Sequence, residues 1–241
     1  MRVAFISDLH ASLDALDAVL SDIAQRGVER VVCLGDIVDL GPEPSSTLER
    51  LQQLQIPCIR GNHDTLDEHP PIQRLAEVED WTRDQLGAAQ LAWLDALPVE
   101  HLEDLDGLRV LCVHASPRSV GDQVLADTPL ETLDAWWGDR QFDVMVCGHT
   151  HVPLLRRLNE QLVVNVGSVG QPFRWAFSGG PPPAVLPWSE YAIVGHVAGR
   201  VSVEHCRIPF DLEAFTRALR ASTFPGGDAW LEQWARRAPR P

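Results

Sequence analysis

Five short apolar runs constrain the fold most strongly, because each ends directly in a polar segment. The runs are rich in β-branched residues and predict buried strands. The polar segments that follow them are Asp8-Leu9-His10, Gly35-Asp36, Gly61-Asn62-His63-Asp64, His114 and Gly148-His149-Thr150-His151. Open α/β sheets carry their chemistry at the carboxyl ends of strands. We therefore expect these segments to meet at one end of a sheet.

The polar segments consist of residue types that bind transition metals. Imidazole and carboxylate donors suit Mn, Fe, Zn, Ni or Co. A lone histidine is more often a buried residue with satisfied hydrogen bonds, whereas a cluster of such residues indicates a metal site. Two divalent ions about 3.5–4 Å apart form a clamp for phosphoryl chemistry. An anion between the ions offsets their repulsion, and Asp36 is the natural bridging carboxylate.

The remaining sequence alternates between strand and helix patterns, which favours an α/β layered sheet. We expect strands at 2–7, 30–34, 57–60, 108–113, 143–147 and 161–166, and a hairpin of 191–197 and 200–207. We expect helices at 13–26, 46–55, 72–95 with a break near Gly87, 129–138, 211–221 and 228–237. Gly27 is placed to end the first helix, and Ser46 with Glu49 resembles a capping box that opens the second.

The length of 241 residues fits one large domain or a domain with an appendage. We predict a single domain over 1–241, with an aromatic, Pro- and Gly-rich loop at 171–188 and a C-terminal helical appendage at about 209–238. The favoured interpretation of the loop is a hydrophobic cover or a homodimer contact. The alternative is a stacking platform for a nucleobase.

Charge and cysteine content restrict the partners and the compartment. A net charge of −14 argues against duplex nucleic acid and against an anionic membrane. A small phosphate substrate stays compatible, because two bound cations would dominate the local field. The five cysteines have no paired spacing and are interpreted as small hydrophobic residues, which indicates a reducing, cytoplasmic setting. Because the first strand is predicted to begin at Arg2, we expect no signal peptide, and no apolar run approaches the length that spans a bilayer.

The ordered polar segments resemble those of the calcineurin-like metallophosphoesterase superfamily from residue 3 to about residue 170. Residues 35–42 (GDIVDLGP) and 165–172 (NVGSVGQP) resemble its small single-domain bacterial and archaeal phosphodiesterase branch. Arg174 departs from the branch, which has an arginine directly after Gln-Pro, because Phe173 intervenes. The resemblance implies a layered β-sandwich flanked by helices, with the metal site at the carboxyl ends of the strands.

The resemblance also implies roles for individual residues. It assigns a first divalent ion to Asp8, His10, Asp36 and His151, and a second to Asp36, Asn62, His114 and His149. Mn²⁺ is the first choice, with Fe, Zn, Ni and Co as alternatives. The implied mechanism is in-line attack on phosphorus by a metal-activated hydroxide. His63 would stabilise or protonate the leaving oxygen, and Asp64 would orient the His63 ring.

Four further residues are weaker candidates for substrate contacts. Arg60 and Arg118 could reach a substrate phosphate, although arginines on loops are more often simply solvated. Asn165 and Ser168 could touch the site from the next strand end, and a role in forming a turn is an equal alternative.

The favoured function is hydrolysis of a small phosphodiester, such as a cyclic nucleotide. The alternative is a phosphomonoesterase, of the protein Ser/Thr phosphatase or dinucleoside polyphosphate hydrolase type, because the ligand set is the same. A non-catalytic scaffold is less favoured, since every ligand and His63 are present.

Overall fold

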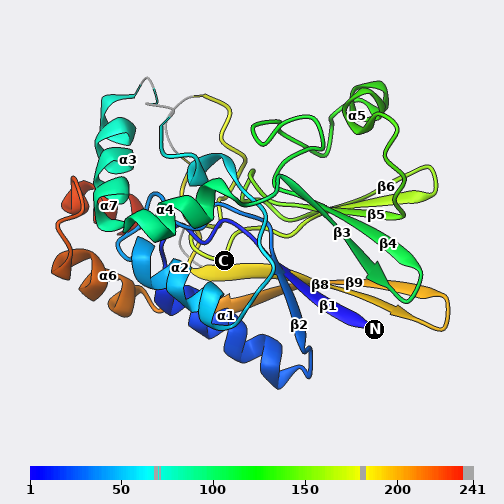
Figure 1. The fold of residues 1–241 in the computed structure, drawn as a ribbon, viewed down its shortest axis with the longest axis horizontal. Helices are drawn as coiled ribbons and strands as arrows, with labels where there is room; N and C mark the ends of the chain where they lie inside the picture. Colours follow the sequence, from blue (N-terminus) through cyan, green and yellow to red (C-terminus); the bar gives the residue numbers. More distant parts are fainter. Residues whose placement is uncertain (68–69, 71, 180–182, 236–241) are drawn as a thin grey trace.

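Two β-sheets face one another in the computed structural model, which describes residues 1–67, 70, 72–179 and 183–235, the last three by backbone alone (Figure 1). The first sheet has the order β2-β1-β8-β9 and the second the order β3-β4-β5-β7-β6. The first comprises β1 (Arg2–Ile6), β2 (Arg30–Cys33), β8 (Trp188–Val197) and β9 (Arg200–Pro209). The second comprises β3 (Glu100–Leu105), β4 (Leu108–Val113), β5 (Val144–Cys147), β6 (Leu154–Leu158) and β7 (Gln161–Asn165).

Seven α-helices occur in the described part of the chain. They are α1 (Leu13–Gln25), α2 (Pro44–Gln53), α3 (Gln73–Gln85), α4 (Ala88–Asp95), α5 (Leu130–Trp137), α6 (Leu212–Ala221) and α7 (Gly227–Ala235). A short 3₁₀ turn, η1, covers Asn62–Asp64. No helix among these residues is long and apolar enough to cross a membrane.

Parallel pairing brings the candidate site residues to one end of the sandwich. β1 pairs parallel with β2, and β5 pairs parallel with both β4 and β7. The carboxyl ends of the strands within each parallel set therefore lie at a common edge. Four of the five polar segments follow β1, β2, β4 and β5, the fifth, residues 61–64, follows an isolated bridge, and all five meet as predicted.

The core has three apolar layers. Between the sheets, Phe5 and Val32 pack in one cluster with Val146. Outside the first sheet, Leu16 of α1 packs in a cluster with residues of α2. Outside the second sheet, Leu133 of α5 lies in a third cluster. The predicted layered β-sandwich flanked by helices is confirmed.

Several predicted elements differ from the structure. Residues 57–60 form only an isolated parallel bridge, Cys33 to Cys58, in place of a strand. Helix α2 begins at Pro44, which suits the first helical turn, and not at a Ser46 cap. Strands β3 and β6 were not expected, because their half-exposed sequences carry charges and lack an apolar run. The break at Gly87 is confirmed, and its N–H donates to Gln90 Oε1 at 2.9 Å.

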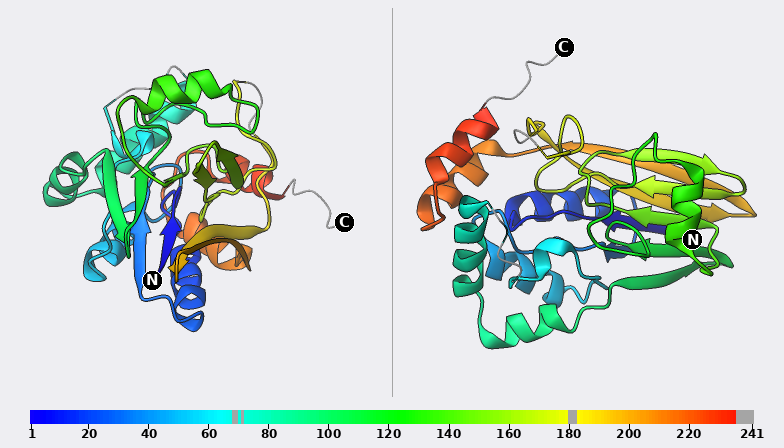
Figure 2. Two further views of the ribbon diagram at one scale, coloured as in Figure 1. Left: turned by 90° about the vertical axis from the view of Figure 1, so that its right-hand side faces the viewer. Right: turned by 90° about the horizontal axis from the view of Figure 1, so that it is seen from above.

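Helices α3, α6 and α7 gather at one end of the molecule, where Figure 2 shows them side by side. Val78 of α3, Phe215 of α6 and Trp230 of α7 share one apolar cluster. Residues 236–237 of the predicted last helix, residue 238 of the predicted appendage and residues 180–182 of the predicted loop lie outside the described residues. All five cysteines are buried free thiols.

Candidate metal centre

The loops at the strand ends turn sharply through the left-handed region, which non-glycine residues rarely adopt. The residues concerned, with their φ angles, are Asp8 (54°), His10 (47°), Asp36 (54°), His149 (66°) and His151 (58°). Backbone hydrogen bonds hold the first two loops together, from Asp8 N to Gly35 O and from His10 N to Asp36 O, both at 3.0 Å. Such backbone outliers gather at functional sites, where the surrounding structure supports their strain.

Two glycines allow the loops to approach closely. A Cβ on Gly148 would collide with the side chains of Ser7 and Asp8. A Cβ on Gly61 would collide with both the backbone and the side chain of Asp36. Neither glycine has a positive φ angle, so the backbone conformation would accept other residues. Glycine is required at both positions because there is no room for a Cβ atom.

The loops assemble two groups of donor atoms that share one carboxylate. Asp8, His10, Asp36 and His151 each offer one ligand atom, and these atoms lie within 4.8 Å of one another. Asp36, His114 and His149 form a second group by the same measure. Asn62 Oδ1 lies 3.0 Å from His114 Nε2, which places the amide oxygen beside the second group.

Backbone carbonyls orient three of the imidazoles. Nδ1 of His10 lies 3.0 Å from Asp39 O, that of His114 lies 2.8 Å from Leu34 O, and that of His151 lies 2.6 Å from Gln171 O. A carbonyl only accepts hydrogen bonds, so each Nδ1 carries its proton and each Nε2 faces the donor groups, as in metal-binding histidines. His10 Nε2 and His151 Nε2 lie 3.1 Å apart, which suits two lone pairs aimed at one cation.

Asp36 supplies the test of whether divalent ions fit this site. Its Oδ1 accepts the backbone N–H of His63 at 2.8 Å. Its Oδ2 is buried and has no hydrogen-bond partner, yet it lies 3.3 Å from His114 Nε2 and 3.8 Å from His10 Nε2. A buried carboxylate oxygen without a partner is unfavourable. Cations between the two donor groups would satisfy it, so the residues fit a metal pair bridged by Asp36.

Two imidazoles of the cluster are neutral at pH 7, the form that binds metal, whereas a third is protonated. Burial and the neighbouring imidazoles lower the pKa of His10 to about 4 and that of His149 to about 4. Although burial opposes ionisation, the surrounding imidazoles hold the pKa of Asp36 well below its usual value. Burial likewise opposes protonation of His114, but the Asp36 carboxylate raises its pKa to about 9. A metal ion bound by His114 must therefore displace a proton.

His63 lies beside the cluster and belongs to neither donor group. Its side chain is 29% exposed, and its Nδ1 lies 2.8 Å from Asp39 Oδ2. Thr82 of α3 donates to the other oxygen of Asp39 at 3.0 Å. Burial acts against protonation of His63, but the Asp36 charge and the hydrogen bond to Asp39 raise its pKa to about 9.

The predicted orientation of His63 by Asp64 is wrong. Asp64 accepts the backbone N–H groups of Gly61, Asp36 and Ile37, at 2.8, 2.9 and 2.7 Å. It is buried and ties the η1 turn to the loop after β2. Asp39 is the carboxylate on the His63 ring. The signal in the sequence was a second aspartate three residues after Asp36, in the turn Gly35-Asp36-Ile37-Val38-Asp39.

The predicted substrate contacts do not converge on the centre. Asn165 is fully buried, and its amide donates to Gly148 O at 2.5 Å and to Thr150 Oγ1 at 3.0 Å. Ser168 is fully buried and donates to Asp8 O at 2.8 Å. The alternative turn-forming role therefore fits both. Arg118 Nε is 2.9 Å from Asp122 Oδ2, and its guanidinium lies over the Trp136 ring at 4.7 Å.

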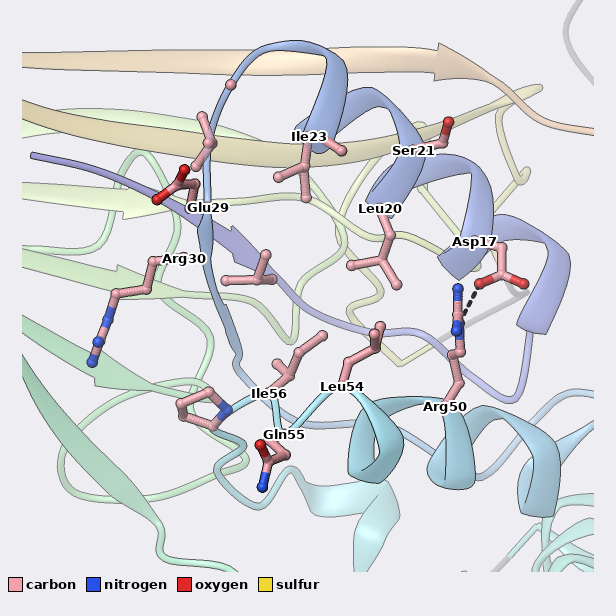
Figure 3. A pocket seen from close by; sticks show the side chains of 15 residues that line it. Asp17, Leu20, Ser21, Ile23, Glu29, Arg30, Arg50, Leu54, Gln55 and Ile56 are labelled. Carbon is pink, nitrogen blue, oxygen red and sulfur yellow. Dashed lines mark hydrogen bonds and ion pairs between the residues drawn. The ribbon is translucent and has the colours of Figure 1, made fainter.

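A cavity of about 400 Å³ opens onto the centre. Asp36, His63, His149 and His151 line it, whereas Arg60 and Arg118 do not. Arg74 and Gln123, which carried no motif, do. A larger cavity, about 850 Å³, lies between α1 and the end of α2, where Asp17 pairs with Arg50 (Figure 3). None of the predicted site residues, all within the described part of the chain, lines that larger cavity, so size alone does not identify the site.

Known proteins resemble this chain over most of its length. A Methanocaldococcus jannaschii protein of uncharacterized function is 31% identical over 194 residues, covering 70% of this chain and 76% of that protein. The phosphodiesterase YfcE of Escherichia coli is 27% identical over 217 residues, covering 82% of this chain and 98% of the relative.

The fold and the sequence family agree. A metallophosphoesterase structure from Sphaerobacter thermophilus superposes with a TM-score of 0.74 at 28% identity, over 98% of this chain and 99% of the other. A Pyrococcus horikoshii protein has a TM-score of 0.78 at 22% identity, over 97% and 96% of the two chains, which shows the shared fold. The sequence matches the calcineurin-like phosphoesterase superfamily domain over residues 1–181. This match covers more than half of the chain, and the donor groups around Asp36 agree with it. The chain therefore belongs to the calcineurin-like phosphoesterase superfamily.

Proposed function

We propose that this protein is a phosphoesterase that uses two divalent metal ions to hydrolyse a small phosphodiester. The observation that carries the proposal is the pair of donor groups joined at Asp36, whose buried Oδ2 has no hydrogen-bond partner. Asp8, His10, Asp36 and His151 would hold one ion, and Asp36, Asn62, His114 and His149 the other. Mn²⁺ is our first choice among the ions that suit this donor set.

When bound, the two ions would polarise phosphoryl oxygens and lower the pKa of a water. The protein's own residues supply the proton chemistry. The hydrogen bond from His63 Nδ1 to the Asp39 carboxylate favours the imidazolium form of His63. His63 can then donate a proton to the leaving oxygen. Asp39 holds the ring for this step, and Asp64 keeps the turn that carries it in place.

The preference for a diester rests on relatives and not on the ligand set. A relative covered over nearly its whole length is named a phosphodiesterase, and this supports the same class of substrate here. A phosphomonoesterase would use the same metal ligands and is the alternative. The buried free thiols suit a reducing, cytoplasmic setting.

The test compares bis-(p-nitrophenyl) phosphate with p-nitrophenyl phosphate. Metal-stripped protein receives Mn²⁺, Ni²⁺, Zn²⁺ or Mg²⁺ singly, alongside His63→Ala, Asp36→Asn and a His101→Ala control, whose ring pairs with Glu103 away from the centre. We expect metal-dependent turnover of the diester that is lost in both site variants and kept in the control. Faster turnover of the monoester would reverse the order of the two activities. Full diester turnover by Asp36→Asn would refute the metal pair.

A further inference from the structure

The cavity at the metal centre has two chemically distinct ends. One end carries the catalytic candidates Asp36 and His63 with His149 and His151. The other is apolar and includes Leu40, Ile72, Leu75, Phe173, Phe177 and Trp230. These residues come from four separate segments: the loop after β2, the start of α3, the loop before β8 and the last helix, α7. At about 400 Å³, the cavity has room for a group larger than a phosphate.

Phe173 links the two ends. Its ring stacks on His151 with centroids 4.2 Å apart and planes 17° apart. Its N–H donates to His151 O at 3.1 Å, and it forms a β-bridge with Val185. These contacts fix a flat aromatic surface next to a metal-ligand candidate.

The other two aromatic walls differ in exposure. Phe177 is 38% exposed, so part of its ring is open to solvent. Its carbonyl accepts the Gln123 side chain at 2.5 Å, which anchors the loop at this point. Trp230 is 8% exposed and packs against Phe224 with centroids 5.5 Å apart. The cavity thus presents both a fixed and a partly open aromatic wall.

The charge of the cavity as a whole favours an anionic ligand. Among the described lining residues, Asp36 is the only carboxylate, and it lies at the metal end. Arg74 lines the apolar end, where its guanidinium lies over the Trp230 ring at 5.6 Å and donates to Gly226 O at 2.9 Å. Although the chain as a whole has a net charge of −14, this cavity offers positive charge to a negatively charged ester.

We propose that the substrate is a phosphoester that carries a planar aromatic ring, seated against Phe173 and Phe177 while the phosphate lies at the metal residues. This inference rests on the proposed phosphoesterase function. Flat aromatic walls favour a flat aromatic ligand, because offset stacking adds to the burial of apolar surface. A nucleobase and a simple aryl group share this chemistry, and the test below separates them.

The test measures binding of matched ligand pairs that differ only in the ring. Adenosine monophosphate is compared with ribose 5-phosphate, and phenyl phosphate with methyl phosphate, by calorimetry. The Mn²⁺-loaded His63→Ala protein is used so that turnover is limited. We expect the ringed member to bind at least about tenfold more tightly in the nucleotide pair, in line with base–aromatic stacking. A similar preference for phenyl phosphate would identify a general aryl site, and its absence a nucleobase site.

Two further variants locate the preference. Adding Phe177→Ala to the His63→Ala protein should abolish most of the preference for the ringed ligand. Trp175→Ala is the matched control, because Trp175 is 53% exposed in the same loop and does not line the cavity. Equal affinities within both pairs, or equal losses in the two loop variants, would overturn the inference. Turnover of bis-(p-nitrophenyl) phosphate is assayed in parallel on the protein with His63 intact. Turnover without ring preference refutes only this inference, and ring preference without turnover refutes only the proposed function.

Discussion

At the residue scale, the environment of each side chain separates the roles of similar residues. Asp36, Asp39 and Asp64 lie in adjacent loops and are all buried. Asp36 keeps one oxygen without a hydrogen bond, Asp39 holds the His63 ring, and Asp64 binds three backbone N–H groups. Of these three carboxylates, Asp36 is the one with an oxygen that accepts no hydrogen bond, and this oxygen faces both donor groups.

Asp36→Asn should prevent the metal pair from binding. The amide removes the bridging charge that offsets repulsion between two cations. We expect the metal content of the purified protein, measured by elemental mass spectrometry, to fall to near zero together with turnover. Asp17→Asn is the control, since that carboxylate is half-exposed and pairs with Arg50. Retention of two ions by Asp36→Asn would contradict the bridging role.

Asp39→Asn should leave the metals bound but weaken proton donation by His63. Losing the carboxylate lowers the pKa of His63, so its imidazolium form disappears at a lower pH. The alkaline limb of the pH–rate profile should shift to lower pH. The decrease in kcat should be no more than the roughly 10²- to 10⁴-fold that general acid catalysis contributes. An unchanged profile with a reduced metal content would instead indicate a purely structural role.

At the element scale, the strands with apolar runs could be predicted, and the two edge strands of the second sheet, β3 and β6, could not. β1, β2, β4, β5 and β7 are apolar runs because both of their faces are covered. β3 and β6 are edge strands, and their exposed residues interrupt the apolar run that would predict a strand. They can be identified only by their pairing with β4 and β7. The metal-ligand candidates other than Asn62 follow buried strands, whereas Asp39 and Arg74 acquire their positions from tertiary contacts.

Gly61→Ala tests the close approach of the loops after β2 and before η1. The added methyl group would displace the Asp36 backbone and carboxylate. We expect a loss of about 1–3 kcal/mol in the free energy of unfolding, measured in urea, as overpacking typically produces, together with weaker metal binding. Gly121→Ala is the matched control, because its nearest neighbour, Ser119 Oγ, is 3.8 Å from the added atom. Equal stability of the two variants would show that the loops can separate.

At the scale of the whole molecule, the metal centre joins segments that are far apart in the sequence. Its candidate ligands run from Asp8 to His151 and come from loops of both sheets. Ions bound between them would connect the two halves of the sandwich at one end. Since α3 and α7 line the same cavity, the chain beyond β9 completes this end of the molecule.

Removal of the metal should therefore lower the stability of the whole protein. A ligand that binds only the folded state at about 1,000 times its Kd adds roughly 4 kcal/mol to the free energy of unfolding. We expect chelation to lower Tm in calorimetry, and Mn²⁺ to restore it. Asp36→Asn is the control, because its Tm should not respond to the ion.

The increase in the free energy of unfolding that Mn²⁺ produces should become larger as the pH rises. The pKa of His114 is about 9 in the folded chain, so below that pH each ion bound there displaces a proton. The stabilisation by Mn²⁺ should therefore be larger at pH 8.5 than at pH 6. Each pH unit contributes about 1.4 kcal/mol for one displaced proton. Titrations of Tm against Mn²⁺ at the two pH values measure this difference, and an increment independent of pH would mean that no proton leaves His114 when the ion binds.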